Sequence, residues 1–331
     1  MGISVLALTP ALSCSKTDHE QTLGSDEKDK VTKTFSLAID TGMGNVLIET
    51  LDILVFGTDS LQRLEAYQRF EGPLTEKIYL ASTAGDKQVF ACANSQYESG
   101  DWMKVHSVSG LYDFTYELES ERREHPVMSG QASVSAGIDS CAVISLKRLT
   151  SEIMLNSINC DFRGKPYEGE KIMDGRIYLI NVNTQGRIFN DSDKNPSKLA
   201  NVGILNESDI FKFSEPALIM QDLPSEIGEE RLFPDIHLCC CPNHGTEEGF
   251  GSPYTRLVIE GKVQGEIYYW AATINREGDE NGITGSGKYV YNLTIRRKGS
   301  RDPDCPASIT DTEFTFSEKE WEEQEPYIVS F

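Results

Sequence analysis

The segment 255–274 reads TRLVIEGKVQGEIYYWAATI, and its composition indicates the fold class. Two strand-like runs follow one another in it, rich in Val, Ile and Tyr, with a short turn at Gly265 between them. These residue types are enriched in β-strands. Runs of the same kind recur from KTFSLAI (33–39) to TEFTFSEKEW (312–321), separated by Gly, Asn, Asp and Pro. The pattern predicts an all-β protein.

One long run, CAVISLKRLTSEIMLNSI (141–158), changes the parity of its apolar positions. Ile144 and Leu146 share one parity, whereas Leu149, Ile153 and Leu155 share the other. A change of parity moves side chains to the opposite face of a strand, so we expect a bulge or break near 147–150.

A second segment, SLQRLEAYQRF (60–70), leaves its secondary structure open. Its apolar spacing fits one or two helical turns, and it also fits a strand at a sheet edge.

The first 13 residues, MGISVLALTPALS, carry no charge and precede the polar tract SKTDHEQTLGSDEKDK (15–30). This pattern predicts a secretory signal peptide over 1–13, too short for a membrane-spanning helix of about 20 residues. The residues Ala11-Leu-Ser-Cys14 resemble a bacterial lipobox. We therefore expect Cys14 to carry lipid and residues 14–31 to form a flexible tether. The alternative is a frayed terminus with an ordinary thiol.

Length and charge limit the protein further. The 331 residues suffice for about two domains. The 31 basic and 52 acidic residues give a net charge of −21, and without a cluster of Lys and Arg we expect no nucleic-acid partner. The polar loop at 183–203 is the best candidate boundary. We predict an N-terminal β-sandwich domain over 32–185 and a C-terminal one over 186–331.

Three consecutive cysteines lie within HLCCCPNH (237–244). His237, Cys239, Cys241 and His244 form a conceivable zinc or copper site. The spacing fits no established zinc signature, and small thiols also fill core strands, so we expect neither metal nor cofactor. Lipidation of Cys14 would leave seven of the eight cysteines, an odd number that does not suit a disulfide framework.

Two further motifs have structural interpretations that we favour. GITGSGKY (282–289) has the Gly-x4-Gly-Lys spacing of a phosphate loop, but Tyr289 replaces the required Ser or Thr and a strand follows. We read it as a hairpin turn. In EIYYW (266–270), alternation would separate Tyr269 from Tyr268 and Trp270, which favours core packing over a sugar-stacking platform.

The order of these segments resembles the fimbrillins, the subunits of lipoprotein-derived (type V) pili of Bacteroidales. The resemblance covers nearly the whole chain after Cys14. It implies an all-β fold of two tandem transthyretin-like β-sandwich domains after a lipoprotein signal and flexible tether. It also implies export to the outer membrane, and assembly by addition of a strand from a neighbouring subunit. The segments that carry it are the lipobox, LDILVF (51–56), VFACANS (89–95), VMSG (127–130), SLKRLTSEIML (145–155), CCCPN with TRLVIEGKVQGEIYYW, and KYVYNLTIRRKGSRDPD (288–304).

The expected function is that of a cell-surface fimbrial subunit or anchor lipoprotein that supports adhesion, and not of an enzyme. Its expected partners are other pilus subunits, the outer membrane through a lipid anchor, and host or bacterial surface ligands. The alternatives are a monomeric glycan-binding surface lipoprotein and a secreted hydrolase. The candidate subunit-contact residues alternate in the first strand and at the C-terminus: Phe35, Leu37, Ile39, Tyr327, Val329 and Phe331.

The position of the arginines bears on maturation. Shaft subunits of the resembled family are cut after an arginine near their first strand. Here no arginine occurs between Cys14 and Arg63, which lies beyond LDILVF. We therefore expect residues 33–39 to stay in the first domain, as in an uncleaved anchor or accessory subunit.

Overall fold

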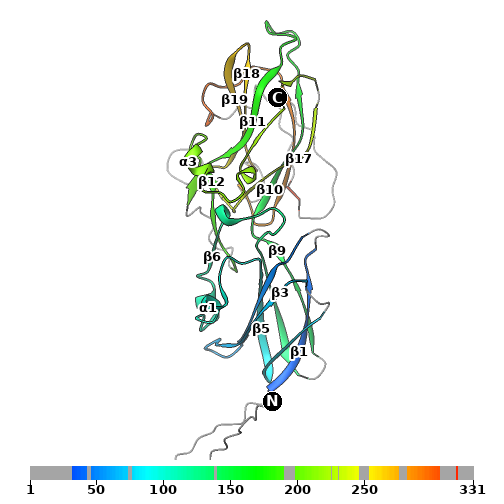
Figure 1. Cartoon of the computed structure of the whole chain (residues 1–331), viewed down its shortest axis with the longest axis vertical. Coiled ribbons are helices and arrows are strands. Elements are labelled where there is room, and N and C mark those ends of the chain that lie inside the picture. The colour runs from blue at the N-terminus through cyan, green and yellow to red at the C-terminus, as the bar shows by residue number, and fades with distance from the viewer. Residues whose placement is uncertain are drawn as a thin grey trace, which may run out of the picture. The chain divides into compact units, whose positions relative to one another are not determined.

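The structure is a computed structural model in which strands dominate (Figure 1). It describes residues 32–42, 46–73, 77–137, 140–189, 198–224, 226–229, 231–245, 253–275, 282–305 and 318–319. The all-β prediction is confirmed, because the helices are single turns: α1 Ser99–Trp102, α2 Val108–Leu111, α3 Glu207–Ile210, and the 3-10 helices η1 Leu118–Ser120 and η2 Pro216–Leu218. Within the described residues, none of these helices has the length and hydropathy needed to cross a membrane.

The first group of sheets lies in the N-terminal half of the chain. A five-stranded sheet has the order β3-β2-β5-β7-β9, and a three-stranded sheet has the order β4-β1-β8. Their facing side chains form one core, which includes Phe35 and Leu37 from one sheet and Ile53 and Val89 from the other. The strands are β1 Thr32–Asp40, β2 Thr50–Gly57, β3 Leu64–Glu71, β4 Ile78–Thr83, β5 Gly85–Ala93, β7 Met128–Ala136, β8 Cys141–Ser145 and β9 Lys147–Arg148.

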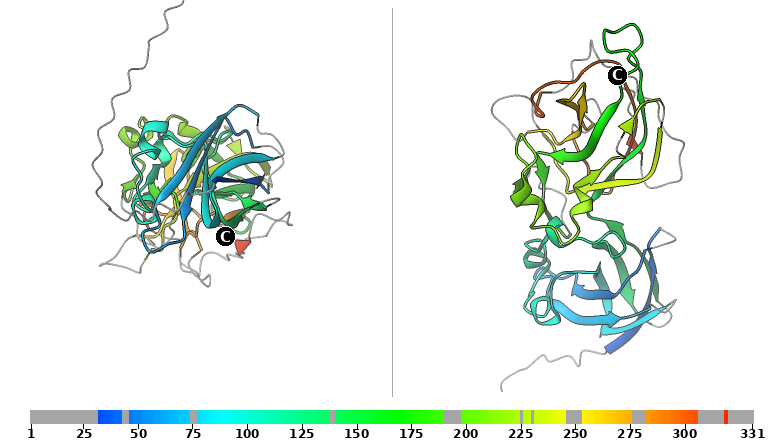
Figure 2. Two further views of the ribbon diagram at one scale, coloured as in Figure 1. Left: turned by 90° about the horizontal axis from the view of Figure 1, so that it is seen from below. Right: turned by 45° about the horizontal axis from the view of Figure 1, so that its top comes forward.

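Strand β2 explains why LDILVF is apolar at every position except Asp52. Ile53 and Val55 face the core between the two sheets, whereas Leu54 and Phe56 face a second core that also contains Trp102. A strand that is buried on both faces has a nearly continuous apolar sequence. Figure 2 shows the blue and cyan strands of this region side by side, in agreement with the pairing of β2 and β5.

The strands of the second group of sheets all lie after residue 150. One sheet has the order β17-β10-β20-β21, and the other has the order β15-β11-β18-β19 with β16 also on β11. Ile153 and Tyr289 from the first sheet share a core with Ile177 and Leu257 from the second. The strands are β10 Ser151–Cys160, β11 Ile172–Ile180, β15 Met220–Asp222, β16 Glu226–Ile227, β17 Arg231–Cys240, β18 Arg256–Val263, β19 Glu266–Thr273, β20 Lys288–Ile295 and β21 Glu318–Lys319.

Two short pairings complete the fold. Strand β6 (Thr115–Glu117) pairs with β13 (Gln185–Arg187), and β12 (Val182–Asn183) pairs with β14 (Leu199–Ala200). The β6–β13 pair therefore joins a segment near residue 116 to one about seventy positions later in the chain, inside the polar loop that the sequence singled out.

The break expected near 147–150 is confirmed. Strand β9 pairs with β7, and only three residues later β10 pairs with β17 and β20. Ile144 thus belongs to the core of the first group, whereas Ile153 belongs to that of the second. The change of parity in the sequence marks the point at which the chain passes from one group of sheets to the other. The predicted domain division at residue 186 stays a prediction.

Two other local expectations are resolved. Residues 64–71 form β3, the edge strand of the five-stranded sheet, so the strand interpretation of 60–70 is the correct one. Residues 255–274 contain the β18–β19 hairpin. Trp270 packs in the same core as Ile177 and Leu257, and Tyr269 packs on the opposite face of the sheet beside Tyr178. The alternation of the three aromatic residues is confirmed.

Gly130 accounts for part of the VMSG motif. A Cβ atom at this position would lie 2.4 Å from the backbone oxygen of Ser145 and 2.9 Å from Cγ2 of Ile144. Only a residue without a side chain lets β7 approach β8 this closely. The glycine is therefore required where the two sheets of the first group converge.

Candidate functional site

Strand β1 lies in the middle of its sheet and has a ladder on each side. It pairs antiparallel with β4 from Thr32 to Leu37, and parallel with β8 from Ser36 to Asp40. At the junction of the two ladders, the backbone N–H of Ser36 donates to the oxygen of Ser140 at 2.9 Å. The first strand of the described chain thus fills a slot between two strands that come from later in the sequence.

The side chains of β1 alternate as expected. Phe35 is 2% exposed and Leu37 is fully buried, whereas Ile39 is half-buried and packs against the same core. Full burial of side chains of this size stabilises a fold by about 1.5–3 kcal/mol each. Without β1, the slot between β4 and β8 would expose the core and the unpaired backbone groups of both strands. Strand exchange between subunits exploits this arrangement of backbone pairing and alternate anchors.

The other end of the chain reaches the second group of sheets. Glu318 and Lys319 form β21, which pairs with Tyr289 and Lys288 at the start of β20. Along Tyr291–Ile295, no strand in the described part of the chain pairs with the edge of β20 opposite β10. The remaining candidate contact residues, Tyr327, Val329 and Phe331, lie outside the described residues, as do Cys14, the signal segment 1–13 and the tether.

The three vicinal cysteines lie at the end of β17 and just after it. Cys239, Cys240 and Cys241 are all buried in the core, at 4%, 0% and 0% exposure. Burial raises the pKa of Cys239 to about 12, and it raises the pKa values of Cys240 and Cys241 as well. A protonated, buried thiol is a poor nucleophile.

His237 of the same motif makes hydrogen bonds to groups other than these thiols. Nδ1 of His237 lies 2.7 Å from Oε1 of Glu152, and its Nε2 lies 3.1 Å from the backbone oxygen of Pro234. Burial opposes ionisation of Glu152, but the contact with His237 lowers the pKa of this carboxyl overall. Among the described residues, no group of three or more His, Cys, Asp or Glu is arranged to hold a metal ion.

The glycine-rich segment is a turn that leads into a strand, as the sequence indicated, but the hairpin interpretation is wrong. Strand β20 pairs with β10 and β21, whereas the preceding strand β19 pairs with β18 in the other sheet. The strand predicted after the turn is β20, and Oγ of Ser286 donates to the backbone oxygen of Arg148 at 2.5 Å. The hydroxyl of Ser151 accepts from the backbone N–H of Gly287 at 3.1 Å and donates to the oxygen of Thr284. These bonds tie the turn to the chain where it enters β10.

A buried carboxyl, Glu121, was missed by the sequence interpretation. Its side chain is 2% exposed, and its Oε2 atom has no hydrogen-bond partner in the structure. Burial raises the pKa of Glu121 to about 8, although a backbone hydrogen bond from Val127 and the charge of Arg148 act in the opposite direction. Glu121 follows η1, and nothing in a sequence rich in exposed acids distinguishes it.

A second missed group is the buried pair of Asp52 and Arg69. The guanidinium of Arg69 donates from Nε and Nη2 to both carboxylate oxygens of Asp52, each at 2.8 Å, and Tyr67 adds a bond of 2.7 Å. Hydrogen bonding to Asp52 raises the pKa of Arg69. Arg69 also donates to the backbone oxygen of Tyr97 at 2.5 Å, which fixes the start of the segment that contains α1.

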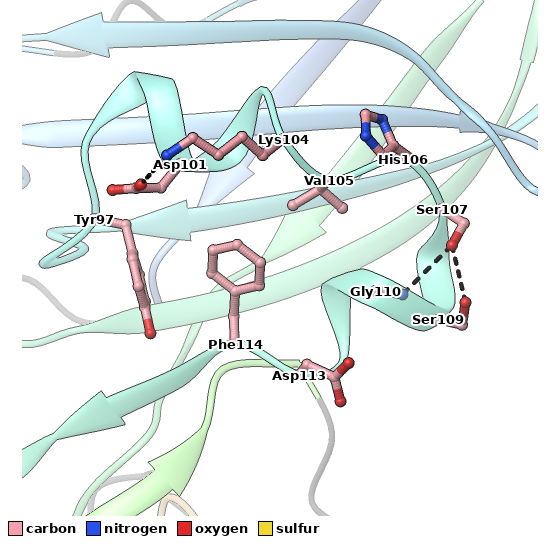
Figure 3. Close-up of a pocket in the computed structure, with 10 residues that line it drawn as sticks. All are labelled: Tyr97, Asp101, Lys104, Val105, His106, Ser107, Ser109, Gly110, Asp113 and Phe114. Carbon is pink, nitrogen blue, oxygen red and sulfur yellow. Dashed lines mark hydrogen bonds and ion pairs between the residues drawn. The ribbon is translucent and has the colours of Figure 1, made fainter.

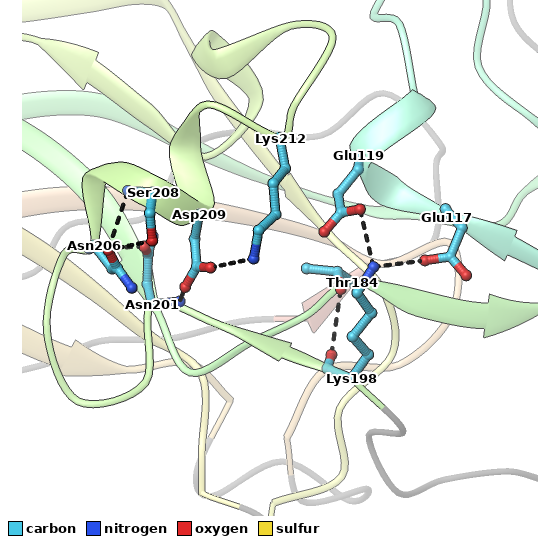
Figure 4. A network of polar contacts seen from close by, with 9 residues as sticks. All are labelled: Glu117, Glu119, Thr184, Lys198, Asn201, Asn206, Ser208, Asp209 and Lys212. Carbon is cyan, nitrogen blue, oxygen red and sulfur yellow. Dashed lines mark hydrogen bonds and ion pairs between the residues drawn. The ribbon is translucent and has the colours of Figure 1, made fainter.

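A polar network surrounds the β12–β14 region (Figure 4). Nζ of Lys198 lies 2.9 Å from Oε2 of Glu119 and 3.2 Å from Oε2 of Glu117. Asp209 accepts from Nζ of Lys212 at 2.6 Å and from the backbone N–H of Asn201 at 3.0 Å. Lys198 therefore holds the loop at 198–201 against the segment of β6 and η1.

A pocket of about 540 Å³ lies in the segment between Tyr97 and Phe114 (Figure 3). It is lined by aromatic, hydroxyl and charged side chains from α1, α2 and the turns beside them. The pocket could not be predicted from the sequence, because its lining residues belong to a loop whose course depends on packing against β3.

The fold is that of the fimbrillins and related adhesion proteins of Bacteroidales. Solved structures with this fold include a candidate cell adhesion protein from Bacteroides eggerthii, with a TM-score of 0.65 and 15% sequence identity, over 91% of this chain and 98% of that one. A fimbrilin (FimA) from Porphyromonas gingivalis aligns with a TM-score of 0.61 and 14% identity, over 83% of this chain and 93% of that one.

A tip fimbrial protein of Porphyromonas gingivalis, with a C-terminal truncation, aligns with a TM-score of 0.55 and 12% identity, over 88% of this chain and 100% of that one. The sequence itself matches no established family profile and no curated protein. The similarity to these proteins therefore lies in the fold, and it agrees with the resemblance that the order of the sequence motifs indicated.

Proposed function

We propose that this protein is a structural subunit or anchor of a cell-surface fimbria, and not an enzyme. The observation that carries the proposal is the position of β1, an N-terminal strand that supplies two buried side chains between two later strands. The similarity of the fold to a fimbrilin, to a tip fimbrial protein and to candidate adhesion proteins supports it.

We propose further that subunits join by strand addition. The C-terminal residues Tyr327, Val329 and Phe331 alternate, as the donor in such a contact must, because alternate side chains enter the acceptor groove. An apolar strand whose backbone groups are left unpaired would invite edge pairing with other chains. The partners in this proposal are neighbouring pilus subunits.

The position of Arg63 favours an uncleaved subunit. A cut after Arg63 would remove β1 and also β2, whose residues from Leu51 to Phe56 are all fully buried. Loss of both strands would disrupt the core between the two sheets of the first group. It would do more than open the one slot between β4 and β8. We therefore propose that β1 stays in place and that the chain remains attached to the outer membrane through lipid on Cys14.

Exchange of Tyr327, Val329 and Phe331 for serine tests the assembly mechanism. The matched control is Ile328→Ser, which changes the opposite parity of the same strand. We expect the triple variant to be absent from sheared surface polymers, because its donor strand lacks the anchors, while the control is incorporated normally. Incorporation of both variants, or failure to find the wild-type chain in any surface polymer, would refute the proposal.

A further inference from the structure

The pocket is lined by residues of the segment from Tyr97 to Phe114, and hydrogen bonds and packing hold this segment in place without a ligand. The backbone N–H of Leu64 donates to the oxygen of His106 at 3.2 Å, and the N–H of Val108 donates to the oxygen of Gln62 at 3.2 Å. Beneath the segment, Trp102, Val105, Val108 and Leu111 are buried. A site that is ordered in advance loses less entropy on binding.

One wall of the pocket is aromatic. The rings of Tyr97 and Phe114 lie next to each other in Figure 3, with centroids 4.8 Å apart and an interplanar angle of 64°. The buried ring of Trp102 stacks on Phe114 at 4.6 Å and 14°, so the wall is supported from behind. Both pocket rings are half-buried and present apolar surface to the opening.

Each of the two acids beside this wall is paired with a cation. Asp101 accepts from Nζ of Lys104 at 3.0 Å, which lowers the pKa of that carboxyl and keeps it ionised. On the other side, Asp113 lies 3.3 Å from Nη1 of Arg187. Each acid therefore pairs with a cation, but only Lys104 belongs to the lining, whereas Arg187 lies outside it. The lining itself holds two carboxylates and one ammonium group, and it offers both donors and acceptors.

Hydroxyl and imidazole groups complete the rim. Oγ of Ser107 and Oγ of Ser109 are 2.8 Å apart, and His106 is exposed beside them (Figure 3). A volume of about 540 Å³ falls within the range of about 300–1,000 Å³ that small-molecule sites occupy. The combination of an apolar ring wall with hydroxyl and carboxylate groups suits a neutral ligand that has one apolar face and many hydroxyls.

We propose that this pocket binds a neutral pyranose ring of a surface glycan. The C–H face of the sugar would lie on Tyr97 and Phe114, and its hydroxyls would bond Asp101, Asp113 and the serines. A strongly anionic sugar is disfavoured, because it would meet two carboxylates. The inference does not rest on the proposed assembly mechanism, since the pocket is formed within one chain.

Saturation-transfer NMR on the purified full chain tests the proposal directly. The probes are the methyl glycosides of glucose, galactose, mannose and N-acetylglucosamine, with the methyl glycoside of sialic acid and a tyrosine-containing tripeptide as competitors. For a single ring in an open pocket, we expect at least one neutral glycoside to bind with Kd on the order of 1 mM. We also expect Tyr97→Leu and Asp113→Ala each to weaken its binding about tenfold.

Two control variants match these changes outside the pocket. Phe211→Leu alters an aromatic side chain that is 82% exposed, and Asp235→Ala removes an exposed acid of β17. We expect both controls to bind like the wild type. Asp113 is itself exposed, so its variant stays informative even where Tyr97→Leu fails to fold. The proposal is wrong if no neutral glycoside binds, if both pocket variants bind like the wild type, or if only the sialoside or the peptide binds.

Discussion

At the scale of single residues, the least replaceable positions are those where backbones meet. At Gly130, the backbone oxygen of Ser145 occupies the space that a side chain would need. Gly299 is similar, because a Cβ there would lie 2.1 Å from the backbone oxygen of Tyr269. Both glycines belong to motifs that the sequence interpretation used, and the close approaches give a physical reason for them.

Gly130→Ala is therefore expected to destabilise the protein. The added methyl group must push β7 away from β8, and overpacking of this kind costs about 1–3 kcal/mol. The matched control is Gly100→Ala in α1, where nothing lies within 4 Å of the new Cβ. Chemical denaturation of the two variants should show a loss of unfolding free energy for the first only. Equal stability of both would contradict the observed approach.

Glu121 makes stability depend on pH. Burial raises its pKa to about 8 in the folded state, against 4.5 for an ordinary glutamate carboxyl. The unfolded chain therefore releases this proton first as pH rises, and the contribution of Glu121 to stability is present below pH 4.5 and is lost as pH approaches 8. The loss amounts to at most about 1.4 kcal/mol per pH unit.

Glu121→Gln should remove this dependence. We expect the melting temperature of the variant to exceed that of the wild type by more at pH 8 than at pH 5, because the amide cannot ionise. Glu119→Gln is the nearby control, since Glu119 already pairs with Lys198 at 2.9 Å. A variant of Glu121 whose advantage did not grow with pH would show that the carboxyl is ionised in the native protein.

At the scale of elements, β1 is held by buried side chains and pairs with two strands that lie far from it in the sequence. Its neighbours β4 and β8 begin 46 and 109 residues after the first residue of β1, respectively (78 − 32 and 141 − 32). The alternation of Phe35, Leu37 and Ile39 was readable from the sequence, but the pairing partners were not. A period of two identifies the buried face of a strand and contains no information about which strands lie beside it.

Substitution within β1 should separate its two faces. Phe35→Ala is expected to lower the free energy of unfolding by about 3–5 kcal/mol, and Leu37→Ala by about 2–5 kcal/mol, because each leaves a cavity in the core. Thr34→Ala, on the exposed face, should change it by less than about 0.5 kcal/mol. Denaturant titration gives all three values. A large effect at Thr34 would indicate that the strand is rotated from the orientation described.

The burial of the three vicinal cysteines at the end of β17 should protect their thiols from reagents. Under native conditions, a maleimide reagent should modify Cys141 and Cys305, which are exposed, and leave Cys239, Cys240 and Cys241 unmodified. Peptide mass mapping locates the label, and unfolding in guanidinium before labelling is the control that should expose every thiol. Rapid native labelling of the vicinal cysteines would contradict their place in the core.

At the scale of the whole molecule, strand runs and their order were predictable, whereas the way in which they share sheets was not. The break at 147–150 could be located because the apolar parity changes there. The β6–β13 pairing and the buried Glu121 could not be predicted, since both depend on contacts between distant segments. The pocket was equally hidden, because its aromatic wall is assembled from a loop without a periodic pattern.

The mature N-terminus is the prediction that belongs to this scale. We expect the surface protein to begin at Cys14 with lipid attached and to retain β1. Labelling of cells with a fatty-acid probe should mark the wild type and not Cys14→Ala, while Cys141→Ala serves as the cysteine control. N-terminal sequencing completes the test. A chain that starts near Thr34 or later would mean that a protease opens the slot, and the shaft-subunit interpretation would replace the anchor.

The double pairing of β1 has a mechanical consequence. A pull on the chain ahead of Thr32, directed along the strand, loads the ladder to β4 and the ladder to β8 together. The strand cannot peel away one bond at a time, because the two ladders overlap at Ser36 and Leu37 and must shear at once. Resistance to such a load is a matter of rate, set by the barrier to unfolding rather than by equilibrium stability. A strand inserted in this way resists brief tension and detaches only when the tension is sustained.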